Sequence, residues 1–145
     1  MNIPEYVTVE EVQRVCKALG IRDWTCLKEP SILPEEADCI LAAINVQKMP
    51  IGSADFLMGL EVELEHGLRF SDANVTNNHP LLTGKIVLAH LKETLDYYQR
   101  IDVAEMEADL FKALCAGDLA KAKLKYQKLT KAKIQLYNTE QAQLG

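Results

Sequence analysis

Apolar residues recur at intervals of three and four along most of this chain, and no segment alternates apolar and polar residues for long enough to predict a β-strand. The first run is bounded, because Thr8 and Glu11 form a capping-box pattern before it and Gly20 follows its last apolar residue. It predicts a helix over residues 8–19. Equivalent signals predict further helices over about 34–48, 53–67, 80–115 and 119–141. We therefore expect an all-α protein of about five helices in a compact bundle.

The chain divides into three parts by pattern and composition. Residues 1–54 form a helical lead-in, 55–108 a helical core, and 109–145 most of a C-terminal helical hairpin, whose two helices meet at Gly117-Asp118. This hairpin either packs on the rest of the chain or pairs with a second copy. We expect a homo-oligomer, a dimer, formed through it. The apolar positions available for either contact are Leu110, Leu114, Leu124, Leu129 and Ile134.

Charge and composition exclude several kinds of partner. The 145 residues include 16 basic and 21 acidic side chains, a net charge of −5, and only the stretch 121–133 has lysines without nearby acids. Nucleic acid is therefore not an expected partner. We find neither a signal sequence nor a long apolar run, so we expect a cytoplasmic protein without membrane contact. Thr83-Gly84-Lys85 lacks the upstream glycines of a phosphate-binding loop, which argues against a nucleotide cofactor.

One stretch, EVELEHG at residues 61–67, places a carboxylate on the apolar side of its helix. On a wheel of about 100° per residue, Phe56, Leu60 and Leu64 define the direction of the core. Glu63 falls beside Phe56, whereas the neighbouring glutamates point away. His66 lies one turn further along, about 60° round the wheel, so that Glu63 and His66 can converge on one point.

The next helix repeats this pair in reverse order. His90 lies at the edge of its apolar stripe, and Glu93 follows three residues later. If the two helices pack antiparallel, both carboxylates and both imidazoles face one volume. Glu-x-x-His pairs on facing helices are how di-iron and di-manganese bundle proteins hold their metals. We therefore predict a metal site formed by Glu63, His66, His90 and Glu93, with Fe, Mn or Zn as the ion.

Two alternatives stay open at this point. The same four side chains can form a buried hydrogen-bond network without an ion, since buried polar groups need partners in any case. The chain is then a non-catalytic, oligomeric interaction module. If a metal is bound, four ligands suit a mononuclear site, and a dinuclear one needs further carboxylates from a second copy. Glu61, Glu65 and Tyr97 are candidates to support the ligands. We assign no enzymatic reaction.

A long connection separates the two helices of this site. Residues 67–79 contain no periodic apolar run, which is typical of a loop that is either functional or disordered. Thr76, Asn77 and Asn78 are predicted to cap the following helix. His79, directly before Pro80, is predicted to be exposed to solvent.

The residues of the site also carry a family resemblance. The runs GLEVELEHG (59–67), NVTNNHPLLTGKIVLAHLKETLDYYQRI (74–101) and MEA (106–108) resemble a family of small bacterial, archaeal and phage proteins known only as a domain of unknown function. The resemblance implies a stable helical unit that contains Glu63, His66, His90 and Glu93, and it implies no reaction. His79 replaces the Asp that the family usually has before Pro80. Thr94-Leu95 replaces a pair that ends in Pro, which implies an unbroken helix here.

Overall fold

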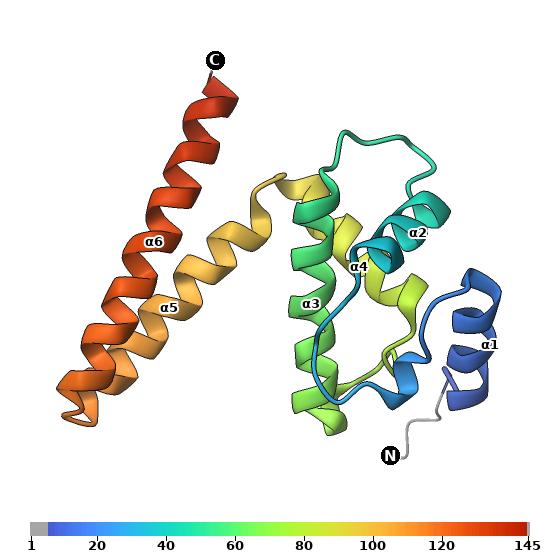
Figure 1. Cartoon of the computed structure of the whole chain (residues 1–145), viewed down its shortest axis with the longest axis horizontal. Helices are drawn as coiled ribbons and strands as arrows, with labels where there is room; N and C mark the ends of the chain where they lie inside the picture. Colours follow the sequence, from blue (N-terminus) through green and yellow to red (C-terminus); the bar gives the residue numbers. More distant parts are fainter. Residues whose placement is uncertain (1–5, 145) are drawn as a thin grey trace. The chain divides into compact units, whose positions relative to one another are not determined.

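The computed structural model describes residues 6–144, and all regular structure in that part of the chain is helical (Figure 1). The expected all-α class is confirmed, with six α-helices in place of about five. The helices are α1 (Val9–Leu19), α2 (Pro34–Ile44), α3 (Ser53–Arg69), α4 (Pro80–Glu93), α5 (Tyr97–Cys115) and α6 (Leu119–Leu144), with the 3₁₀ turns η1 (Trp24–Cys26) and η2 (Ser71–Ala73). Contacts divide the chain between Leu95 and Asp96 into two compact units, whereas the sequence suggested boundaries after residues 54 and 108.

The additional helix arises from a break that the sequence did not predict. The expected helix over 80–115 ends at Glu93, because Thr94 takes an extended conformation (φ −158°, ψ 140°) and α5 starts again at Tyr97. Asp96 then precedes the first turn of α5, and its carboxylate accepts two hydrogen bonds from Arg100, at 2.9 and 2.8 Å. The helix therefore breaks at Thr94 although no proline is present there.

The core of the N-terminal unit lies where α2, α3 and α4 meet. Phe56, Leu60 and Leu64 of α3 are fully buried, as the wheel predicts. Gly84 brings α4 close to α2, because a Cβ at this position would lie only 2.7 Å from Ile40 Cγ2. Trp24, the single tryptophan of the chain, is also fully buried in this unit.

A buried carboxylate fixes the start of α2. Glu36 is 2% exposed, and its two oxygens accept hydrogen bonds from the backbone N–H groups of Arg22 and Leu33, both at 3.0 Å. The guanidinium of Arg22 donates to the same carboxylate from Nε at 2.9 Å and from Nη2 at 2.6 Å. Every oxygen of this buried charge therefore has partners, which is what a buried ion requires.

Helix α3 continues beyond its predicted end. Gly67 is not a helix terminus, since α3 runs on to Arg69. A Cβ on Gly67 would overlap Asn78 Oδ1 and would lie 3.0 Å from Asn74 Nδ2. Glycine is present here because the connection between α3 and α4 folds back against the helix.

The cap of α4 is His79 rather than one of the three preceding polar residues. His79 is 7% exposed, so the prediction of an exposed side chain is wrong, and its Nδ1 accepts a hydrogen bond from the Leu82 N–H at 3.3 Å. Asn77 and Asn78 instead adopt positive φ angles of 50° and 58°. Asparagine tolerates this left-handed region better than most residues, which explains why asparagines occupy the turn.

The His79 cap predicts a pH dependence of stability. Burial lowers the pKa of His79, and Arg14 adds to this effect while Glu11 opposes it. As pH falls, the unfolded chain therefore takes up the proton first, so the stability due to neutral His79 is lost as pH falls below about 6.5. Protonation also removes the Nδ1 acceptor. We expect His79→Asp, which keeps a capping oxygen, to reduce the loss of unfolding free energy between pH 7.5 and 5.5 by about 1 kcal/mol. Urea titrations of the wild type and of His79→Asp at each pH measure this loss. Parallel curves of unfolding free energy against pH would contradict the capping role of neutral His79.

The C-terminal unit is a hairpin of α5 and α6 joined by Gly117 at φ 69°. Small side chains line the seam between the helices, with Ala113 of α5 and Ala122 and Ala132 of α6 buried. The seam is closed further along by the Lys125–Asp109 ion pair at 2.5 Å. Within residues 6–144, none of the helices has the length and apolar character needed to cross a bilayer.

Candidate functional site

Two helices of the N-terminal unit bring Glu63 and His90 into contact. Glu63 lies on α3 with 16% of its side chain exposed, and His90 lies on α4 with 30% exposed. Glu63 Oε1 is 3.1 Å from His90 Nδ1, within hydrogen-bonding distance. Glu63 therefore points inward from α3, as the helical wheel predicts, and contacts the neighbouring helix α4.

The second histidine of the predicted set is more loosely placed. His66 Nδ1 lies 3.9 Å from Glu63 Oε2, and 54% of the His66 side chain is exposed. Glu63 thus stands between two imidazoles, with one carboxylate oxygen directed to each. Solvent-exposed side chains change rotamer within nanoseconds, so the His66 ring is free to turn toward or away from Glu63.

Glu93 does not join this group. It is the last residue of α4 and is exposed, and within residues 6–144 no hydrogen bond or ion pair involves its carboxylate. Across the same residues, no three His, Cys, Asp or Glu side chains are placed so that they could hold a metal ion together. Three of the four predicted ligands are therefore linked in series through Glu63, and they do not close around one point.

Two of the supporting residues proposed from the sequence make other contacts. Glu61 accepts a hydrogen bond from the backbone N–H of Ile32 at 3.2 Å, which attaches α3 to the segment before α2. Glu65 pairs with Arg69 at 2.9 Å on the exposed side of α3. Tyr97 begins α5 and belongs to the C-terminal unit.

The Glu63–His90 contact has a chemical consequence. A carboxylate accepts the proton of an Nδ1–H group, which makes Nε2 the basic nitrogen of a neutral imidazole. A histidine oriented in this way is suited either to brace two helices or to present Nε2 to a metal ion.

A second candidate surface lies on the hairpin. Two ion pairs join α5 to α6 along one side: Arg100–Glu140 at 2.9 Å and Glu107–Lys133 at 2.7 Å. Arg100 and Glu107 are seven residues apart on α5, and Lys133 and Glu140 are seven residues apart on α6. Residues at this spacing lie in one stripe along the same side of a helix. Seven residues after Glu107 lies Leu114 of α5, and seven residues before Lys133 lies Tyr126 of α6. Leu114 and Tyr126 therefore lie on the same side of the hairpin.

Large apolar side chains are exposed along this side. Tyr126 is 62% exposed, and Tyr137, four residues after Lys133, is 60% exposed. We use the name hairpin face for five exposed apolar residues at the stripe positions or one turn away from them: Leu114, Leu119, Tyr126, Tyr137 and Leu144. A shallow groove follows part of the face, lined by Tyr126, Leu129, Thr130, Lys133, Ile134 and Tyr137.

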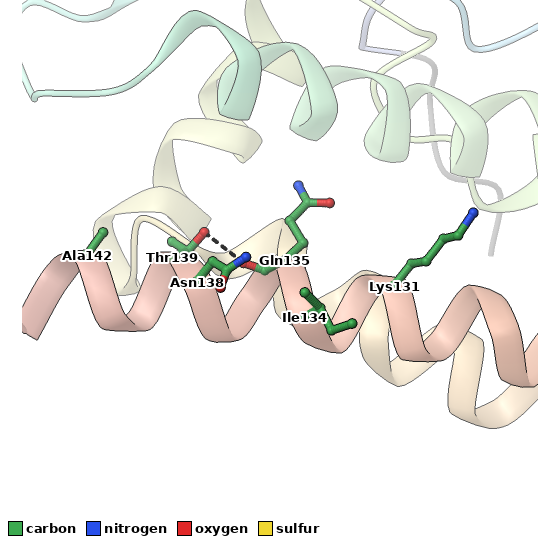
Figure 2. A pocket seen from close by; sticks show the side chains of 6 residues that line it. All are labelled: Lys131, Ile134, Gln135, Asn138, Thr139 and Ala142. Carbon is green, nitrogen blue, oxygen red and sulfur yellow. Dashed lines mark hydrogen bonds between the residues drawn. The ribbon is translucent and has the colours of Figure 1, made fainter.

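Another shallow groove on α6 has a different character. Figure 2 shows its lining side chains, with the Thr139 hydroxyl donating to the Gln135 carbonyl at 3.2 Å. The lining residues are Lys131, Ile134, Gln135, Asn138, Thr139 and Ala142. Lys131 is the one titratable group among them, so this groove offers no acid–base pair.

The sequence predicted the hairpin but, apart from Leu114, not the residues of its exposed face. Of the apolar positions predicted to pack, Leu129 is buried while Leu124 and Ile134 are exposed, and Tyr126 and Tyr137 were not among them. The available signal was the seven-residue spacing of Leu119 and Tyr126, and of Tyr137 and Leu144. The spacing alone does not say which stripe faces the other helix.

Comparison with known proteins gives a family and no function. The family model described as "Protein of unknown function (DUF5661)" matches residues 12–108, which include most of α1, all of α2 to α4 and part of α5. No curated protein and no solved structure matches the chain.

Proposed function

The chain belongs to the DUF5661 family of proteins of unknown function, and we propose from its own residues that it is a self-associating module whose hairpin binds a second copy of the same chain. The observation that carries the proposal is the hairpin face. Two packed helices bury only the seam between them, and large apolar residues remain exposed along one side. A second hairpin placed on this side would complete a four-helix bundle.

The size of the face suits a dimer. Helix α6 has 26 residues, so it is roughly 39 Å long at about 1.5 Å per residue. Helix α5 has 19 residues and is roughly 28 Å long, so a face about 10 Å wide on each helix covers about 700 Å², which is within the range that each partner buries in a standard protein interface. Burial of Leu and Tyr side chains over this area supplies the driving force.

The charges of the hairpin favour a second copy over an unrelated partner. Helix α5 carries four acidic and two basic side chains, a net charge of −2, whereas α6 carries six lysines and one glutamate, a net charge of +5. A hairpin with one acidic and one basic helix is complementary to itself. In this account the Glu63–His90 contact braces α3 against α4 in the N-terminal unit and takes no part in the assembly.

Substitution of the two tyrosines tests the hairpin face. We expect Tyr126→Ser with Tyr137→Ser to weaken dimer formation at least tenfold, because truncating a buried aromatic at an interface costs more than 1 kcal/mol. Size-exclusion chromatography with light scattering, over a range of concentrations, measures the change. The matched control is Leu124→Ser. Leu124 is 61% exposed but lies about 160° from Tyr126 on the helix wheel. Equal effects of the two variants would contradict the assignment of the face.

A second candidate function is the binding of an Fe, Mn or Zn ion by Glu63, His66 and His90. The arrangement of one carboxylate between two imidazoles favours it, since a carboxylate and two histidines form a common three-ligand set. His66 would have to turn toward the other two groups. Glu93 is not included in this candidate because it lies apart from them.

Metal analysis distinguishes an ion site from a brace. A bound ion predicts about one metal per chain after incubation with each ion and dialysis, lost in Glu63→Ala and His90→Ala but kept in Glu65→Ala. It also predicts that a chelator lowers the thermal midpoint, because an ion bound only to the folded state stabilises it. Absence of metal from the wild-type protein, with no effect of chelator, would exclude this candidate and leave the bracing role.

A further inference from the structure

Two arrangements of the proposed dimer place the hairpin faces together with two-fold symmetry. If the two-fold axis runs parallel to the helices, α5 of each copy lies beside α6 of the other, and neighbouring helices are antiparallel throughout. If the axis runs across the helices, α5 lies beside α5 and α6 beside α6. Both arrangements bury the same face, so apolar contact alone does not choose between them.

The charges of the two helices favour the first arrangement. In the second arrangement, two copies of α6, each with a net charge of +5, are neighbours at a helix spacing of about 10 Å. In the first arrangement each α6 has an α5, of net charge −2, on both sides. The two copies of α6 then lie on a diagonal, at about 14 Å, so that neither is the nearest neighbour of the other.

We propose that the dimer is an antiparallel four-helix bundle in which the acidic α5 of each copy packs beside the basic α6 of the other. This inference rests on the proposed self-association and adds its geometry. Within each chain, the Glu107–Lys133 and Asp109–Lys125 pairs show the same complementarity between an acidic α5 and a basic α6. The bundle repeats that complementarity between chains, and repulsion between like helices disfavours the other arrangement.

The two arrangements make different predictions for distances between equivalent residues. In the proposed bundle the two copies of α6 run parallel, so any α6 residue is at the same height as its equivalent in the partner. In the alternative they run antiparallel, and the height difference changes by about 3 Å for each residue along the helix. Three reporter sites on one side of α6 therefore decide between them.

Ala120, Gln127 and Asn138 are suitable reporter sites. All three are exposed, and they fall within about 20° of one another on the wheel, opposite the buried Leu129. A spin label would be attached at one site at a time through Ala120→Cys, Gln127→Cys or Asn138→Cys. The background would carry Cys26→Ser, Cys39→Ser and Cys115→Ser and would keep Cys16, which is 2% exposed.

Double electron–electron resonance on the full-length dimer measures the three distances. We expect them to agree within a few ångströms. Antiparallel α6 helices would instead make at least one of the three differ from the others by about 10 Å or more, because Ala120 and Asn138 are about 27 Å apart along the helix. A dimer with such a spread would overturn the proposed pairing but not self-association. A monomer without a dipolar signal would overturn both.

Discussion

Gly84→Leu is expected to lower the free energy of unfolding by about 3 kcal/mol, the upper part of the range for overpacked cores. Gly84 lies where α4 crosses α2 and α3, and a Cβ there would be 2.7 Å from Ile40 Cγ2, 2.9 Å from Ile44 Cδ1 and 3.3 Å from Phe56 Cζ. A leucine side chain needs much more room than one methyl group. The three helices would have to separate, which would expose the core that Phe56 fills.

The matched control for this substitution lies on the same helix. Ala89→Leu adds a side chain of similar size at an exposed position of α4, and surface changes of this kind alter stability by about 0.5 kcal/mol or less. Urea unfolding followed by fluorescence reports on the right unit, because Trp24 is the single tryptophan and is buried there. Equal midpoints for the two variants would show that the helices do not cross as closely as described.

Glu36→Ala is expected to cost about 2–3 kcal/mol. Its carboxylate is buried and accepts hydrogen bonds from two backbone N–H groups and from the Arg22 guanidinium. Removal of the carboxylate leaves buried donors without an acceptor, which is the expensive way to break such a network. The guanidinium is 39% exposed and can be rehydrated, and this keeps the loss below the largest values known for buried pairs.

The contribution of Glu36 to stability should also depend on pH. Burial of Glu36 raises its pKa, but hydrogen bonds from Arg22 and Leu33 outweigh this effect, so that the pKa lies below its usual range. The unfolded chain therefore binds the proton first as pH falls, and the stability due to Glu36 is lost below about pH 4.5. We expect the difference between wild type and Glu36→Ala to shrink there. Glu35→Ala, at the exposed neighbouring position, should match the wild type at every pH.

The part of the site that could be predicted lies within one unbroken helix. Phe56, Leu60 and Leu64 define a core direction for α3, and the helix period then places Glu63 inward without knowledge of any other element. The contact with His90 follows from the packing of α3 on α4, which reversed Glu-x-x-His patterns anticipate. His66 and Glu93 depart from the prediction because each lies near a helix end, where neighbours no longer enclose the side chain.

Features that depend on tertiary contacts were beyond such reasoning. The break at Thr94 and the burial of His79 were not predicted, because both positions read as ordinary helix or loop residues. The hairpin face was not predicted from the sequence either. The residues of the hairpin face and those of the seam recur at similar spacing in the sequence. The Glu107–Lys133 and Arg100–Glu140 ion pairs of the structure show which of the two sets lies on the exposed side.

Sedimentation equilibrium of the unmodified full-length chain tests the central claim most directly. The chain has a mass of 16.2 kDa. Self-association through the hairpin predicts a mass that rises toward twice this value as concentration increases and returns to the single-chain value on dilution. A single-chain mass at every concentration up to the millimolar range, in low and in physiological salt, would contradict the account.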